Sequence, residues 1–382
     1  MDNKTRTEIK FIYWFAYYNL DSPSVRYRGK YPLEYLKDNY NINSYFITPS
    51  YRPIKILKFL KAYFSALLFR KTGSLIVIQR IHSSFIYSTL LKLLVKFRPL
   101  QTFYDLDDAD YLDYPPQTIY HFIKNCSGVF VGSRELAKNL SKFNNNIILN
   151  TSPTPDPYTV KTKKNSTLTI GWIGDFAGGH KEALLKYFFP ALSDLNFEIK
   201  LILLGVGRKY ESDFKFLVDY FGSTPNILLE MPKNIDWNNE RDIQKRISEF
   251  DIGIATLLDN ELHLSKSAFK LKQYLNNGVP VLSSALSENN FFLQDGENGF
   301  LCSTPEQFRQ RIIEISKMTD ADYMKLSIQA RQSNSDFNLK TYCETLQTGK
   351  GQPLQRKLRE KLNAVSYTHL RAHETKANLV CR

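Results

Sequence analysis

Two lysines four residues apart, Lys266 and Lys270, stand at the start of a segment with helical periodicity. Residues four apart share one face of a helix, where two like charges repel each other unless an anion lies between them. The first turn of a helix also presents unpaired backbone N–H groups, here those of Ser267, Ala268 and Phe269. The spacing therefore predicts a phosphate site in which one of the two lysines contacts the anion.

The elements around these lysines would hold them at one edge of a sheet. Residues 252–255 form a short apolar run that predicts a buried parallel strand, and residues 267–275 follow it with helical periodicity. Gly278 ends this helix, and residues 279–283 begin the next strand. Ligands of open parallel sheets bind beyond the carboxyl ends of the strands, where helix N-termini face anions. A nucleoside diphosphate suits such a position.

Strand and helix signals alternate along the chain, which is typical of parallel sheets with crossover helices. Residues 150–166 are rich in proline, polar residues and lysine, and they indicate a linker between two such series. We therefore predict an α/β protein in which two Rossmann-like domains face each other across a cleft. The expected strands are residues 10–17, 44–48, 74–79, 102–106, 128–132 and 146–149, then 168–173, 199–204, 227–230, 251–255, 279–283 and 299–302.

The expected domain bounds follow from these series. The first domain spans residues 1–155, the second spans 166–335, and a helical segment follows over 336–364. Residues 365–382 resemble a translated sequencing adapter, and we expect them to be a non-native tail outside the fold.

Composition excludes several classes of protein. A chain of 382 residues with 43% hydrophobic residues is long and apolar enough for two folded domains, which excludes general disorder. Its four cysteines form no Cys-x-x-Cys pair, so a reducing compartment is expected. No apolar run reaches the roughly 20 residues of a membrane-spanning helix, and the N-terminus lacks the pattern of a signal peptide. These features predict a cytoplasmic protein, either soluble or peripheral at the inner membrane face.

The net charge of +13 is compatible with three kinds of partner: nucleic acid, an anionic membrane surface or an anionic small substrate. Nucleic acid would explain the charge but not the order of the motifs, so we expect no nucleic-acid partner. Residues 52–71 alternate basic with aromatic and aliphatic residues at near-helical spacing. That pattern predicts either a basic amphipathic surface on an anionic bilayer or a packed helix with solvated lysines.

An ordered pattern over residues 250–301 carries a family resemblance. Phe-Asp-Ile-Gly is followed by K-x-x-x-K-L-x-Q-Y-x-x-x-G-x-P-V and then by D-G-x-N-G-F-L. This order resembles the C-terminal half of family 4 glycosyltransferases, which are retaining enzymes of the GT-B fold. The resemblance implies transfer of a hexose or related sugar from a nucleotide-diphosphate sugar to a hydroxyl acceptor, such as a cell-surface glycan or a lipid-linked precursor. It further implies that no cofactor or metal is required, and that residues 320–336 cross back onto the first domain.

The same resemblance implies roles for residues of the second domain. A glycine-rich turn at Gly174 leads to Lys181, the first choice for contacting the diphosphate, together with Lys270. Gln273 matches the position that binds the nucleotide ribose, and Glu288 lies in a loop that family members place around the donor. His180 is a weaker candidate, and Ser265 replaces the glutamate that commonly touches the donor sugar. Apart from the resemblance, Gly205-Val-Gly-Arg208 follows a strand and predicts either a tight turn or a nucleotide contact by Arg208.

The first domain offers fewer candidates. His82 follows a strand and loosely resembles a histidine that related enzymes place near the donor sugar. The aspartates of residues 104–110 cluster after another strand, where acceptor hydroxyls could approach, and Ser24-Val-Arg-Tyr-Arg28 follows the first strand. No nucleophile-plus-base arrangement is visible, which fits a retaining enzyme whose leaving phosphate accepts the acceptor's proton. The alternative is a protein that binds a nucleotide sugar without transferring it, and the departures at Ser265 and Gln273 keep that alternative open.

Overall fold

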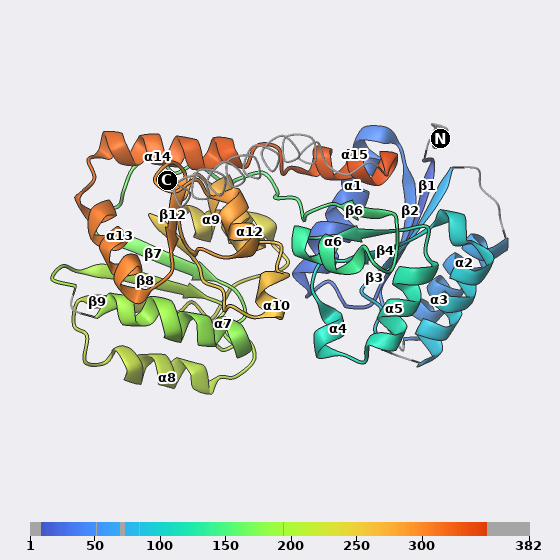
Figure 1. The fold of residues 1–382 in the computed structure, drawn as a ribbon, viewed down its shortest axis with the longest axis horizontal. Helices are drawn as coiled ribbons and strands as arrows, with labels where there is room; N and C mark the ends of the chain where they lie inside the picture. The colour runs from blue at the N-terminus through green and yellow to red at the C-terminus, as the bar shows by residue number, and fades with distance from the viewer. Residues whose placement is uncertain (1–8, 51, 69–72, 84, 194, 350–382) are drawn as a thin grey trace, which may run out of the picture.

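The computed structural model describes residues 9–50, 52–68, 73–83, 85–193 and 195–349. The chain forms two α/β domains that lie side by side along the long axis of the molecule, each built on one six-stranded sheet (Figure 1). Every strand pair is parallel. The prediction of two Rossmann-like domains is therefore confirmed, while the proposed tail at 365–382 lies outside the described residues.

The first sheet has the strand order β2-β1-β3-β4-β5-β6. Its strands are β1 (Phe11–Ala16), β2 (Asn43–Ile47), β3 (Ser74–Gln79), β4 (Thr102–Leu106), β5 (Gly128–Val131) and β6 (Ile147–Leu149). The helical segments are η1 (Val25–Lys30), α1 (Tyr31–Tyr40), α2 (Pro53–Leu68), α3 (Phe85–Phe97), η2 (Pro99–Gln101), α4 (Asp110–Asp113), α5 (Pro116–Asn125) and α6 (Arg134–Leu140).

The second sheet has the order β12-β11-β10-β7-β8-β9. Its strands are β7 (Leu168–Ile173), β8 (Ile199–Leu204), β9 (Ile227–Glu230), β10 (Ile252–Ala255), β11 (Val281–Ser284) and β12 (Gly299–Cys302). Its helical segments are α7 (Gly178–Ala183), η3 (Leu184–Phe188), η4 (Phe189–Leu192), α8 (Ser212–Phe221), α9 (Glu240–Ser248), α10 (Glu261–Leu264), α11 (Phe269–Asn276), α12 (Ser287–Phe292), α13 (Pro305–Lys317) and α14 (Asp320–Ser333).

The strands form where the sequence has short, nearly continuous apolar runs, because both faces of a parallel sheet are covered by helices. Each of the twelve expected strands is present, and their ends agree to within two residues. The largest shift is at β11, which begins at Val281 rather than at residue 279. Pro280 has no backbone N–H to donate to a ladder, so the strand begins after it.

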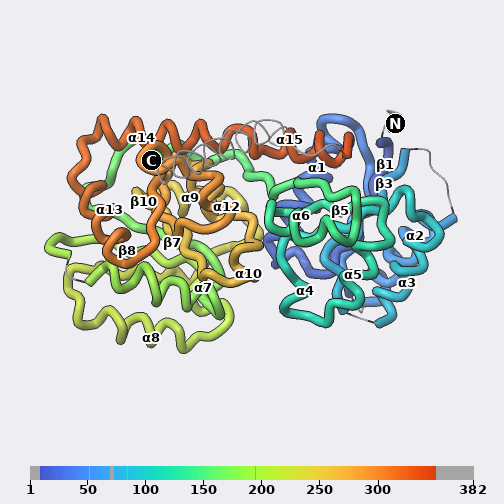
Figure 2. The backbone as a smooth tube through the Cα atoms, viewed as in Figure 1, coloured from blue at the N-terminus to red at the C-terminus, as the bar shows by residue number. Residues whose placement is uncertain are grey.

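A helix that follows the second domain in sequence packs on the first domain and so connects the two. Helix α14 packs in the second domain, where Tyr323 donates a hydrogen bond of 2.9 Å to the carbonyl of Asp251. The chain then runs along the top of both domains into α15 (Leu339–Thr348), which lies on α1 of the first domain (Figure 2). Tyr342 is fully buried there and donates to the Arg28 carbonyl at 3.0 Å. The return to the first domain is therefore made by α15, and the expectation that residues 320–336 make it is wrong.

Candidate active site

The candidate site is a cavity of about 610 Å³ between the two domains. Its walls come from the carboxyl ends of strands in both sheets, which is where parallel α/β sheets place ligands. From the first domain come Ser22, Pro23, Ser24, Arg26, Tyr27, Arg80, Asp107, Asp108 and Ser152. From the second come Ile173, Gly174, Asp175, His180, Arg208, Lys209, Trp237, Ile243, Ala255, Thr256, Leu257, residues 266–271, Gln273 and Asn289.

Helix α11 begins at this cavity. Its N-cap is Ala268, which adopts the left-handed conformation (φ 50°) and provides no side-chain cap for the helix. The first N–H groups of a helix need partners, and a side-chain cap is the usual one. Ser267, Ala268 and Phe269 all line the cavity, so the start of α11 faces the space that a ligand would fill.

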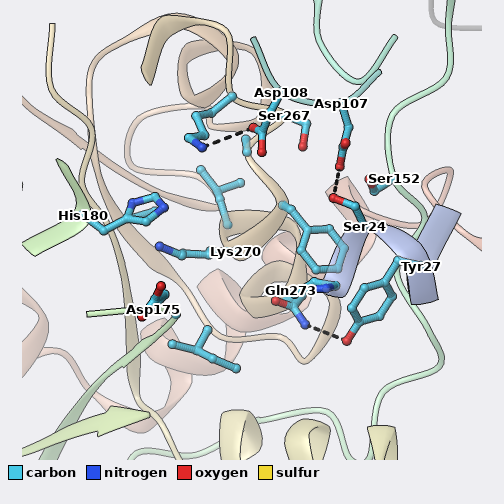
Figure 3. Close-up of a pocket in the computed structure, with 18 of the residues that line it drawn as sticks. Ser24, Tyr27, Asp107, Asp108, Ser152, Asp175, His180, Ser267, Lys270 and Gln273 are labelled. Atoms are coloured by element: carbon cyan, nitrogen blue, oxygen red, sulfur yellow. Dashed lines mark hydrogen bonds and ion pairs between the residues drawn. The ribbon is translucent and has the colours of Figure 1, made fainter. Parts of the chain in front are cut away.

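Lys270 extends from the first turn of α11 into the cavity, between His180 and Asp175 (Figure 3). Its ammonium lies 4.7 Å from the ring centroid of Trp172. Desolvation lowers the pKa of Lys270, and the neighbouring Lys266 ammonium lowers it further, to about 7. This amine is therefore partly deprotonated near neutral pH, and an anion beside it would restore its full charge.

His180 shares this environment. The charge of Lys270 and desolvation both hold the pKa of His180 well below its usual range. Its ring lies 5.4 Å from that of His263, whose pKa burial and the nearby lysines lower to about 4. Both imidazoles are neutral at pH 7, and His180, which lines the cavity, can hydrogen bond to a hydroxyl group without adding charge.

Two glycines bring the backbone close to Lys270. A Cβ on Gly174 would lie 2.7 Å from Cε of Lys270 and 3.0 Å from the Trp172 ring. Gly205 has φ +105°, and a Cβ there would lie 1.9 Å from the carbonyl oxygen of Gly174. Gly205, the first glycine of the Gly-x-Gly after β8, is thus explained by close packing of two backbone turns. A Cβ on the second glycine, Gly207, would instead lie 2.1 Å from the Phe214 ring.

On the first-domain side of the cavity, three aspartates lie around the guanidinium of Arg80. Its guanidinium donates to Asp110 at 2.5 Å and lies 3.4 Å from both Asp107 and Asp108. Lys266 reaches across the cleft to Asp108 at 3.2 Å. Burial raises the pKa of Asp108, but the charges of Lys266 and Arg80 outweigh it and lower the pKa to about 2.

Gln273 also connects the domains. It is buried on α11, lines the cavity, and donates through Nε2 to the Tyr27 hydroxyl at 3.3 Å. Tyr27 in turn donates to Glu240 at 2.5 Å. A side-chain amide with both donor and acceptor atoms at the cavity wall can hydrogen bond to a diol.

The structure places three of the predicted residues away from the cavity walls. Lys181 lies on α7 but turns toward α8, where it forms an ion pair of 2.7 Å with Asp213. His82 stacks on Tyr114 with ring centroids 3.7 Å apart, and burial with the Arg80 charge lowers its pKa to about 4. Glu288 forms a 2.5 Å ion pair with Arg134 of the first domain.

Of four further residues singled out in the sequence, two lie outside the cavity and two line it. Ser265 is fully buried outside the cavity, and its carbonyl accepts a hydrogen bond from Ser133 across the domain boundary. Arg28 pairs with Asp105 inside the first domain at 2.5 Å, whereas Arg26 lines the cavity. Arg208 does reach the cavity and lies over Trp237, 4.4 Å from its ring centroid.

Sequence reasoning missed Arg80 and Asn289. Arg80 precedes the predicted site residue His82 by two positions, and Asn289 directly follows the predicted site residue Glu288. The position of Arg80 directly after β3 was the available signal, because polar residues at the carboxyl end of a parallel strand face the ligand edge. In the part of the chain that the structure describes, no group of three His, Cys, Asp or Glu side chains is placed to hold a metal.

The fold is similar to those of solved glycosyltransferases, although no protein-family model and no curated protein matches this sequence. A glycosyltransferase from Rickettsia africae ESF-5 is 13% identical, with a TM-score of 0.62 over 88% of this chain and 97% of that chain. Sucrose-phosphate synthase from Thermosynechococcus elongatus is 12% identical, with a TM-score of 0.64 over 93% and 100%. Anabaena HepE, solved with UDP and glucose, is 12% identical, with a TM-score of 0.58 over 88% and 98%.

The protein has the GT-B fold. At these identities the likeness extends to the fold, and membership of family 4 stays a prediction from the sequence.

Proposed function

We propose that this protein transfers a sugar from a nucleotide-diphosphate sugar to a hydroxyl acceptor. The observation that carries the proposal is Lys270, a desolvated amine beside the uncapped start of α11 in the cleft between two Rossmann-like domains. A diphosphate would meet both backbone N–H groups and a cation there. In the proposed complex, Lys270 contacts the diphosphate and Gln273 hydrogen bonds to the ribose hydroxyls.

The proposed reaction exchanges one bond at the anomeric carbon of the sugar. The bond from this carbon to the diphosphate oxygen breaks, and a bond to the acceptor oxygen forms. Negative charge grows on the departing diphosphate, and Lys270 with the α11 amides would stabilise it in a preorganised site. The released nucleoside diphosphate takes up the acceptor's proton, so the step needs no separate base.

We propose that the configuration of the sugar is retained. An inverting transfer needs a general base on the acceptor side, and Asp108, with a pKa of about 2, is a weak base. Asp107 is likewise engaged, since it accepts a 2.5 Å hydrogen bond from Ser24 and lies beside Arg80. Because Asp108 is a weak base and Asp107 is already engaged, these carboxylates fit retention better than inversion. The leaving phosphate would then accept the proton.

The acceptor would enter from the first-domain side, where Ser24, Arg80 and Asp107 line the cavity. We propose a hydroxyl of a cell-surface glycan or of a lipid-linked precursor, at the cytoplasmic side of the membrane and without a metal or other cofactor. Structures of HepE with UDP and with UDP-glucose suggest uridine nucleotides as the first donors to test.

A thermal-shift panel of UDP-, GDP-, ADP- and CMP-sugars tests the proposal, because a ligand of the folded state raises the unfolding midpoint. We expect one nucleotide class to raise the midpoint, and we expect donor hydrolysis or transfer with that donor in buffer containing a metal chelator. Absence of a shift with every nucleotide sugar would refute the proposal. The anomeric proton coupling of the product, measured by NMR, decides between retention and inversion.

The alternative is a nucleotide-sugar-binding protein without transferase activity. Ser265 favours this alternative. Family 4 members commonly have a glutamate at this position that contacts the donor sugar, whereas Ser265 is buried and lies outside the cavity walls. Tight binding of one nucleotide sugar, with no hydrolysis and no transfer to any acceptor tested, would support this alternative.

A further inference from the structure

Helices α2 and α3 expose an apolar surface at the end of the first domain that lies farthest from the second domain (Figure 1). Both helices pack on the same face of the first sheet and contact each other. Their outward faces therefore point away from the sheet together. Both outward faces carry several exposed apolar side chains, which is unusual, because a helix on the surface of a soluble domain normally turns a polar face to water.

Helix α2 is apolar on two opposite sides. Its inward stripe is buried against the sheet and consists of Phe59, Ala62, Tyr63 and Ala66. Its outward stripe recurs at spacings of three, seven and four residues and consists of Ile54, Leu57, Phe64 and Leu68, of which Leu57 is 66% exposed. The inward stripe accounts for packing on the sheet, whereas the outward stripe stays exposed.

Helix α3 extends this surface. Phe85 and Ile86 at its start are 85% and 73% exposed, and Phe97 at its end and Leu100 in η2 are also strongly exposed. Leu93 lies between them on the outward side. Exposed apolar patches of this extent on a soluble protein mark an interaction site.

The charges around the surface are of one sign. Residues 39–104 contain ten lysines and arginines and no aspartate or glutamate. Lys55, Lys58 and Lys61 are exposed along α2, and Lys96 is exposed on α3. None of these four lysines forms an ion pair with a carboxylate of the described residues.

We propose that the outward faces of α2 and α3 bind an anionic lipid bilayer. Helices that lie in the membrane interface combine an apolar stripe, which enters the acyl boundary, with flanking lysines, which attract anionic headgroups. A second copy of this chain is a poorer occupant, since a two-fold interface would bring the two basic patches together. The sequence prediction of a basic surface at residues 52–71 is thereby extended to α3, and residues 69–71 of it lie outside the described residues.

The apolar surface of α2 and α3 lies close in sequence to a residue of the cavity wall. Strand β3 ends at Gln79, the next residue Arg80 lines the cavity, and Phe85 begins α3 five residues later. Arg80 at the cavity wall and Phe85 on the proposed bilayer surface are therefore only five residues apart in sequence. A chain held on the membrane through α2 and α3 would keep its acceptor side near the headgroups.

Vesicle flotation of the full chain tests the proposal. We expect binding to vesicles of equimolar phosphatidylcholine and phosphatidylglycerol, weaker binding at high salt, and little binding to phosphatidylcholine alone. The stripe variant I54Q/L57Q/F64Q/L68Q should lose at least about tenfold in the bound fraction. The charge variant K55Q/K58Q/K61Q should lose the preference for the anionic vesicles.

The matched control is V218Q/M324Q/I328Q, which removes exposed apolar side chains of the second domain and should bind as the native chain does. A nucleotide-sugar thermal shift on each variant shows that the fold and the cavity are intact, and it separates failure of this proposal from failure of the transferase proposal. No binding of the native chain to anionic vesicles, or equal binding by the stripe variant, would overturn the proposal. A dimer lost only in the stripe variant, without vesicle binding, would assign the surface to self-association instead.

Discussion

The ammonium of Lys266 lies 3.2 Å from the carboxylate of Asp108, across the cleft that separates the two domains. Lys270, one helical turn later, forms no ion pair with any carboxylate of the described residues. The two lysines that the sequence could not distinguish therefore differ in position and in partners. Lys266 helps to hold the domains together, and Lys270 is the cation presented to the cavity.

Replacing Lys270 by methionine should weaken donor binding strongly. A charged hydrogen bond to the diphosphate is worth about 1.5–3 kcal/mol, so affinity should fall about tenfold to a hundredfold. The unliganded protein should not lose stability, because the variant removes a desolvated amine that Lys266 repels. Thermal shift with and without donor measures both effects.

Two matched variants separate this role from a general effect of charge. Lys181→Met should destabilise the fold, since it leaves the buried carboxylate of Asp213 without its ion pair, but donor affinity should stay within about twofold. Lys325→Met removes an exposed lysine of α14 and should change neither quantity. If Lys181→Met abolished donor binding and Lys270→Met did not, the diphosphate site would lie at α7 as the sequence predicted.

Donor affinity should fall as the pH rises above about 7. The free protein has a Lys270 pKa of about 7, and a bound diphosphate raises that pKa, so above neutrality the complex holds more protons than the free protein. A nucleotide sugar suits the measurement, because its diphosphate diester keeps the same charge through this range. His180 and His263 are already neutral at pH 7, since their pKa values are lowered, and add no competing titration.

Calorimetric titration at several pH values checks this dependence. In the native chain we expect affinity to drop by up to about tenfold per pH unit between pH 7 and the pKa of the complex. The slope should disappear in Lys270→Met. A flat profile in the native chain would show that Lys270 does not take up a proton on binding.

Gly174→Ala should disturb the site through Lys270. The added Cβ would lie 2.7 Å from Cε and 2.8 Å from Nζ of Lys270, so the ammonium must move away from its present position. We expect donor affinity to fall by about tenfold or more, which kinetics or calorimetry would detect. Gly296→Ala is the control, because Gly296 also has positive φ (+80°) but has open space around its Cβ position. Equal effects of the two variants would indicate backbone strain alone.

Glu288→Gln should affect stability rather than donor binding. Glu288 accepts hydrogen bonds from both the guanidinium and the backbone N–H of Arg134, and these contacts join α12 to α6 across the domain boundary. Weakening a buried ion pair should cost about 2 kcal/mol, measured as a lower unfolding midpoint. Addition of Arg134→Met should cost less than the sum of the two single changes. A large loss of donor affinity without loss of stability would instead support the donor role predicted from sequence.

The strands and the start of α11 were predictable because their causes are local. Apolar runs such as residues 168–173 and 199–204 form buried parallel strands in almost any such fold, and Gly278 ends α11 at positive φ (+67°) as expected of a glycine there. The phosphate-ready helix start at residues 267–269 also needs only the order of strand, loop and helix. These features depend on backbone preferences and short-range periodicity.

The direction of each charged side chain depended on contacts between distant segments. Lys181 and His180 are adjacent in sequence, yet they point about 100° apart around α7, so one meets Asp213 of α8 and the other meets the cavity. In the same way, Glu288 pairs with Arg134, while the adjacent Asn289 lines the cavity.

Local patterns therefore determine which segments can bind a nucleotide, because helix starts and strand ends follow from the residues nearest to them. Packing of the two domains decides which charges remain available, because ion pairs such as Lys266 with Asp108 join residues far apart in the chain. An ion pair of this kind forms only after both sheets are in place, so a local sequence pattern cannot predict it.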